Sequence, residues 1–140
     1  MTYSEPILFP TALDVVDARG FLASLSNKIE GFFYRCLNDA DYTMLYLSGG
    51  FDRMLGRSGA DLVKSRSSYS ELTHGNDLRR VMREIDSALD EHRSWRVVYR
   101  LRRADETYIP VLETGGGVFD PKTGELKYLD GVILDLNKIA

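Results

Sequence analysis

The chain has 140 residues, of which 44% are hydrophobic and 28% are charged, and its formal net charge is −3. This length suits one domain with one core, and the composition is that of an ordinary globular protein without repeats or low-complexity tracts. The negative net charge argues against nucleic-acid binding, and no apolar run approaches the roughly 20 residues of a membrane span. There is no signal-peptide core and only one cysteine, Cys36, so we expect a cytoplasmic segment.

The first third of the chain predicts a lead-in followed by a strand pair. MTYSEPILFP carries two prolines and is typical of extended chain, and the apolar spacing of TALDVVDARGFLASLSNKI predicts one or two short helices that Gly20 would divide. From Phe32 onward, FFYRCL and YTMLYLS are rich in aromatic and β-branched residues and are separated by the turn-prone NDAD. This pattern predicts a hairpin.

The middle of the chain predicts helices. A short helix through Phe51 ends at Gly56, and Ser58 is placed to cap a second one. The stretch SYSELTHGND predicts a helical turn that leads into the longest helix. The apolar stripe of that helix consists of Leu78, Val81, Met82, Ile85 and Leu89.

The last third predicts three strands. SWRVVYRLR alternates between apolar and basic residues, as a half-buried antiparallel strand does. TYIPVLETGGGVFD and LKYLDGVILDL are two further strands, joined by the turn sequence PKTGE. Strands separated by short turns, with the helices between the two groups, predict an α+β domain with one antiparallel sheet and helices on one face.

Three consecutive glycines, Gly115 to Gly117, raise the question of a phosphate-binding loop. Such a loop needs a strand, a glycine-rich turn and then a helix whose free N–H groups meet the anion. Here the glycines lie between two predicted strands, and Lys122 and Thr123 follow no suitably spaced glycine pair. We therefore expect these glycines to mark a bulge or a close approach inside the sheet.

Three stretches resemble a known family: GFFYRCLNDADYTMLYLSGGFDRMLG, SYSELTHGNDLRRV and YRLRRADETYIPVLETGGGVFDPKTGELKYLDGVILDL. Their order and content resemble the PAS (Per-Arnt-Sim) sensor domain, in the fold-3 subtype common in bacterial signalling proteins. The resemblance implies a five-stranded antiparallel sheet, in PAS strand order, curled around a small cavity. It also implies cap helices within residues 1–30, a PAS domain at 31–137 and the start of a linker at 138–140.

Alignment with this family implies a mostly apolar ligand pocket on the inner face of the sheet. Pro110 is expected at an edge, a bulge or a non-bonded position, because proline donates no ladder hydrogen bond. Glu113 is the charged member of the pocket, and a carboxylate there must be paired, hydrated or protonated. It either recognises an amine or guanidinium on a ligand or pairs with an arginine such as Arg35. The expected pocket residues are Val97, Tyr99, Leu101, Val111, Glu113, Gly115 and Ile133.

No cofactor or metal is expected. The flavin-binding branch of the family has a reactive cysteine in the short helix before the long one, whereas residues 65–70 contain none. His74 matches the region where some members place a haem ligand, but capping of the long helix is the preferred interpretation. Cys36 is expected to be a small buried hydrophobic residue.

The resemblance implies a regulatory module that is not itself an enzyme. It would sense an unknown small molecule and belong to a larger bacterial protein, such as a histidine kinase, a cyclic-dinucleotide enzyme or a chemoreceptor, with a covalently attached output domain. Asp135 resembles the acidic residue of the family's C-terminal Asp-x-Thr motif, with Asn137 in place of the threonine, and is the expected signal relay.

Two other functions stay open. The first is a ligand-free PAS module that forms a homodimer or docks a protein through its N-terminal helices, where Phe21, Leu22 and Leu25 form an apolar seam. The second is a small α+β hydrolase or isomerase with Glu113 or Asp135 as the base. The enzyme is disfavoured because no His, Ser or second carboxylate lies at a spacing that forms an acid/base pair.

Overall fold

A computed structural model describes residues 15–139. The predicted lead-in at residues 1–10, the first four residues of the predicted helical stretch and the last residue of the predicted linker lie outside the described residues. The elements follow the predicted order with two differences: Gly20 lies inside one continuous N-terminal helix, and a short helix that was not predicted follows the last strand. They are α1 (Val15–Ser26), β1 (Gly31–Cys36), β2 (Met44–Leu47), α2 (Gly50–Leu55), α3 (Gly59–Ser65), η2 (Ser70–Leu72), α4 (Gly75–Asp90), β3 (Trp95–Arg102), β4 (Tyr108–Phe119), β5 (Leu126–Asp135) and α5 (Leu136–Ile139).

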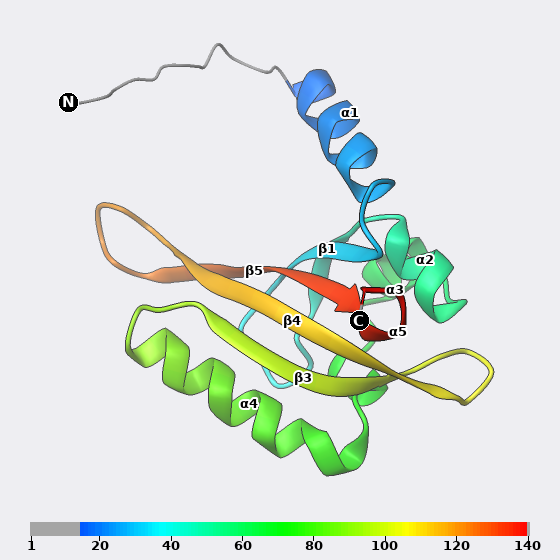
Figure 1. Ribbon diagram of the computed structural model, residues 1–140. Helices are drawn as coiled ribbons and strands as arrows, with labels where there is room; N and C mark the ends of the chain where they lie inside the picture. Colours follow the sequence, from blue (N-terminus) through cyan, green and yellow to red (C-terminus); the bar gives the residue numbers. More distant parts are fainter. Residues whose placement is uncertain (1–14, 140) are drawn as a thin grey trace.

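The strands form a single five-stranded antiparallel sheet in the order β2-β1-β5-β4-β3. The long helix α4 lies along β3, and α1 stands beyond β1 and apart from α4 (Figure 1). The predicted α+β class with helices packed on the sheet is therefore confirmed. We call the sheet face toward α4 the inner face and the opposite face the outer face.

Local signals in the sequence account for the helix boundaries. Gly56 ends α2 with a φ of 66°, and the Ser58 side chain caps α3 by accepting a hydrogen bond from the backbone N–H of Asp61 at 3.1 Å. His74 caps α4, because its Nδ1 accepts from the backbone N–H of Asn76 at 3.0 Å. The capping predicted for Ser58 and His74 is confirmed.

Strand alternation places the core on the inner face. Along β4, Val111, Glu113 and Gly115 are buried, as predicted, and Thr114, which alternates with them, is exposed. Pairing of β4 with β5 begins at Val111, so at Pro110 β4 has only β3 as a partner, which confirms the expected edge position. The largest fully buried side chains are Trp95, Phe32, Phe51, Met44, Leu55, Leu101, Ile109, Leu129, Ile133, Val111 and Cys36.

Candidate functional site

Glu113, on the inner face of β4, is only 3% exposed and carries the one carboxylate of a buried polar cluster. The Tyr34 hydroxyl from β1 and the Trp95 indole from β3 donate hydrogen bonds to its Oε2 at 2.6 and 2.8 Å. The Tyr99 hydroxyl, also from β3, donates to Oε1 at 2.6 Å. The Tyr69 hydroxyl lies 3.2 Å from that of Tyr99. These five residues are called the Glu113 cluster below.

The predicted pairing of Glu113 with Arg35 is wrong. Arg35 alternates with Tyr34 along β1, so its side chain lies on the outer face. There it forms two hydrogen bonds with the Asp130 carboxylate, at 2.7 and 2.8 Å, and covers the Tyr128 ring. Glu113 therefore has uncharged partners.

Two glycines let the aromatic rings reach the carboxylate. Gly115 lies opposite Trp95 on one side and opposite Gly131 on the other, and Gly131 lies opposite Tyr34. A Cβ atom would come within 2.6 Å of the Trp95 ring at Gly115, and within 2.5 Å of the Tyr34 ring at Gly131. The rings fill the space that the two missing side chains leave, and their polar ends meet Glu113. The close approach predicted for the glycine run is thus confirmed at Gly115.

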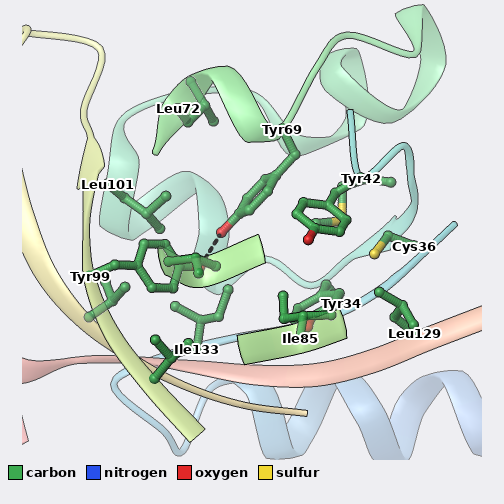
Figure 2. Close-up of a cluster of buried hydrophobic side chains, with 14 of the residues drawn as sticks. Tyr34, Cys36, Tyr42, Tyr69, Leu72, Ile85, Tyr99, Leu101, Leu129 and Ile133 are labelled. Atoms are coloured by element: carbon green, nitrogen blue, oxygen red, sulfur yellow. Dashed lines mark hydrogen bonds between the residues drawn. The ribbon is translucent and has the colours of Figure 1, made fainter. Parts of the chain in front are cut away.

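The cavity beside the cluster is small. Its volume is about 10 Å³, which is about one water molecule. Figure 2 shows Tyr69 reaching toward Tyr99, with Tyr42 and Cys36 on the other side of the space. The lining residues are Tyr34, Cys36, Tyr42, Met44, Tyr69, Thr73, Val81, Ile85, Tyr99, Glu113 and Leu129.

Of the expected pocket residues, Tyr99 and Glu113 line this cavity. The others are buried on the inner face but pack within the core, away from the cavity; they are Val97, Leu101, Val111, Gly115 and Ile133. The sequence interpretation missed Tyr34 and Tyr69. Tyr34 had a usable signal, since it alternates with Phe32 and Cys36 on the buried side of β1.

Burial dominates the electrostatics of the cluster. It raises the pKa of Glu113, and the hydrogen bonds from Tyr34, Tyr99 and Trp95 oppose this rise. Burial, and then the charge of Glu113, raise the pKa of Tyr34 and of Tyr99, so both phenols keep their protons. None of the cavity-lining residues is Lys, Arg or His.

The residues present do not fit a haem group. His74 does not line the cavity, and its ring packs 4.6 Å from that of Tyr108 while its Nδ1 caps α4. A cavity of about 10 Å³ is also far smaller than a haem macrocycle. Among residues 15–139 there is no group of three or more His, Cys, Asp or Glu arranged to hold a metal ion. In the same part of the chain, no helix is long and apolar enough to span a membrane.

A second feature is a groove of about 530 Å³ between α1 and the outer face. Leu22 of α1 is 39% exposed and borders it, and the neighbouring Phe21 is 53% exposed. Leu25, the third residue of the predicted apolar seam, is half-buried. The other lining residues are Phe33, Tyr34, Arg35, Tyr46, Thr114, Asp130, Gly131 and Val132.

Asp135 occupies the junction where the sheet meets the C-terminal helix. It is 5% exposed, and its backbone N–H donates to the carbonyl of Glu30, just before β1, at 2.8 Å. Its carboxylate accepts from the backbone N–H of Asn137 in α5 at 2.9 Å. A polar crevice of about 290 Å³ beside it is also bordered by Arg53, Arg103 and Lys138.

Comparison with known proteins agrees with this geometry. The family described as PAS fold matches residues 44–133. No curated protein matches the chain. The PAS-B domain of Drosophila melanogaster Cycle with bound ethylene glycol superposes with a TM-score of 0.65 at 19% identity, over 74% of this chain and 98% of that one.

Two bacterial structures are similar as well. The N-terminal domain of a diguanylate cyclase with PAS/PAC sensor from Marinobacter aquaeolei gives a TM-score of 0.63 at 17% identity, covering 76% of this chain and 94% of that one. A sensory box histidine kinase/response regulator from Burkholderia thailandensis gives 0.63 at 20% identity, covering 84% and 83%. At these identities the similarity shows the fold.

Proposed function

Because the chain belongs to the PAS fold family, we propose that it is the regulatory domain of a larger signal-transduction protein. PAS domains are generally regulatory sensor modules, and similar domains occur in a diguanylate cyclase and a histidine kinase. A histidine kinase, a cyclic-dinucleotide enzyme or a chemoreceptor is the expected context, with a covalently attached output domain.

The observation that carries this proposal is the pair of hydrogen bonds at Asp135. One joins the end of β5 to the residue before β1, and the other joins it to the start of α5. A shift between β1 and β5 would therefore move Asp135 and disturb its hydrogen bond to α5. In this proposal α5 leads toward the output domain. Asp135 is the relay residue in this proposal.

Two kinds of input signal fit the proposed regulatory function. The cavity of about 10 Å³ favours a module that works without a small molecule, through a homodimer or a docked protein at α1. The Glu113 cluster favours a small polar ligand, which has to displace a tyrosine side chain to enter. Ethylene glycol, which is bound to the PAS-B domain of Cycle, is an example of a small polar molecule bound to a domain of similar fold.

Native mass spectrometry of protein purified from cells separates the two versions. A retained small molecule supports the sensor, whereas an empty dimer supports docking. Phe21→Glu places a charge on the exposed side of α1 and is expected to turn such a dimer into a monomer. Ala23→Glu, also exposed on α1 but on the opposite side of the helix, is the matched control. An empty monomer that regulates no output in the full-length protein contradicts the proposed function.

A further inference from the structure

When Glu113 is ionised, each hydroxyl hydrogen and the indole hydrogen of the Glu113 cluster has an acceptor within the cluster. The Trp95 indole is a donor only, so its hydrogen bond to Oε2 cannot reverse. The Tyr34 and Tyr99 hydroxyls donate to Oε2 and Oε1, and the Tyr69 hydroxyl then donates to the Tyr99 oxygen. Proton count and geometry thus agree on a carboxylate.

Within residues 15–139, no Lys, Arg or His lines the cavity beside this carboxylate. Each element packed around the cavity contributes neutral or acidic groups, and α4 and β5 contribute apolar ones. The titratable neighbours are Tyr34 and Cys36 from β1, Tyr42 before β2, Tyr69 before η2 and Tyr99 from β3. Burial raises the pKa of the Cys36 thiol and of the Tyr42 phenol, so neither supplies charge. Hydrogen bonds alone hold the charge of Glu113, and a buried charge without a counter-ion is costly.

The volume of the cavity restricts what can neutralise Glu113. With the tyrosine side chains in place, about 10 Å³ admits one water molecule and excludes an amine or guanidinium group. A proton needs no extra volume. Oε2 accepts two hydrogen bonds, one of them from the Trp95 indole, which cannot reverse. Oε1 accepts only the Tyr99 hydroxyl, whose hydrogen can turn to the Tyr69 oxygen, so Oε1 is the oxygen that can take a proton along an existing hydrogen bond.

We propose that Glu113 is a proton-binding site, and that proton uptake reverses the hydrogen bond between Tyr99 and Tyr69. The arriving proton bonds to Oε1, which then donates to the Tyr99 oxygen. The Tyr99 hydrogen turns to the Tyr69 oxygen, and the Tyr69 hydrogen turns to a water molecule in the cavity. No covalent bond breaks, Tyr34 and Trp95 keep donating to Oε2, and the cluster gains one proton and loses its charge.

The reversal reaches the helical side of the domain through Tyr69. The backbone N–H groups of Tyr69 and Ser70 both donate to the carbonyl of Asp41, at 3.0 and 3.1 Å. Tyr69 therefore connects the β4 carboxylate to the segment that leads into η2 and α4. This proton site does not depend on the proposed regulatory function, because it needs only the isolated 140-residue chain.

The single tryptophan of the chain gives a direct readout. In ¹⁵N–¹H correlation spectra of the 140-residue protein, the Trp95 indole N–H signal is expected to titrate with one midpoint above about 4.3, the ordinary value for Glu. In Glu113→Gln the signal is expected to stay constant with pH. The Gln oxygen accepts from Tyr34 and Trp95, and its amide donates to Tyr99, as in the protonated form. An indole signal that is constant in the folded wild type, or that moves equally in Glu113→Gln, overturns the proposal.

A second variant tests the reversal. In the wild type, the backbone amide signals of residues 70–73 are expected to titrate with the indole. In Tyr69→Phe the indole signal is still expected to titrate, but those amide signals are not, because the Tyr69 oxygen that accepts from Tyr99 is gone. Tyr46→Phe, at an exposed tyrosine, is the matched control and retains both titrations. If the indole signal of the wild type titrates but the amide signals of residues 70–73 do not shift with pH, the proposed reversal is wrong.

Discussion

The indole ring of Trp95 lies against Gly115, its cross-strand partner, at a position where a Cβ atom would stand 2.6 Å from the ring. The same ring places its Nε1 atom 2.8 Å from Glu113 Oε2. Packing on the glycine and hydrogen bonding to the carboxylate are therefore two results of one ring position. A change at Gly115 must disturb both.

Gly115→Ala is expected to lower the free energy of unfolding by about 1–3 kcal/mol, because the added methyl group overpacks a fully buried ring. Urea denaturation followed by far-UV circular dichroism measures this loss. The fluorescence of Trp95 is expected to change as well, since the ring must shift.

The neighbouring glycine supplies the control. Gly116 lies on the outer face, and a Cβ atom there would meet only the Ser94 hydroxyl oxygen, at 3.8 Å. Gly116→Ala is expected to leave the stability unchanged or to raise it by up to about 1 kcal/mol, because alanine restricts the unfolded chain. Equal losses at both positions would contradict the packing account.

The stability of the wild type relative to Glu113→Gln is expected to fall as pH rises. Burial raises the pKa of Glu113 above its unfolded value of about 4.3, so the folded state binds more protons than the unfolded state between these two pKa values. Stability therefore decreases with pH in this window. Urea unfolding of both proteins across the window measures this difference in the free energy of unfolding. A wild type that becomes more stable relative to Glu113→Gln as pH rises would show that the hydrogen bonds to Glu113 outweigh its burial.

The sequence predicted the fold well because its signals are local. Alternation along β3 and β4 sets the buried face, and Ser58 and His74 cap helices with their own side chains. Alternation aligned by the family resemblance also placed Glu113 on the inner face. These inferences need no knowledge of which strands are neighbours.

Alternation places Tyr34 and Tyr99 on buried faces, but their hydrogen bonds to Glu113 were not predictable in the same way. Tyr34 is 79 residues away in sequence and reaches Glu113 only because β1 pairs with β5 and Gly131 leaves space for its ring. The size of the cavity depends on how the tyrosine rings fill it, which residue spacing does not encode. Arg35 is complementary in charge to Glu113, but alternation along β1 places its side chain on the other face of the sheet.

If the proposed function holds, Asp135→Ala is expected to uncouple input from output in the larger signalling protein proposed above, while leaving the domain folded. The substitution removes the acceptor for the Asn137 N–H and frees the start of α5. Asp135→Asn keeps an oxygen acceptor and is expected to retain coupling, which separates the hydrogen bond from the charge. Output activity with and without stimulus is the measurement, and normal regulation in Asp135→Ala would refute the relay.

Asp77 and Arg100 tie the first turn of α4 to β3. The Asp77 carboxylate accepts from the Arg100 guanidinium at two points, both at 2.9 Å, and from its backbone N–H at 3.0 Å. These bonds lower the pKa of Asp77 against the opposing effect of burial, so their stabilisation is present above about pH 3.9 and is lost as pH falls through the folded pKa. Asp77→Asn is expected to cost about 1–3 kcal/mol near neutral pH, toward the lower end because Arg100 is half-exposed, and less in acid. Urea unfolding near neutral pH and in acid measures this loss, and Asp90→Asn, at an exposed position of the same helix, is the control. A loss of unfolding free energy that is the same at both pH values would contradict the ionic contribution.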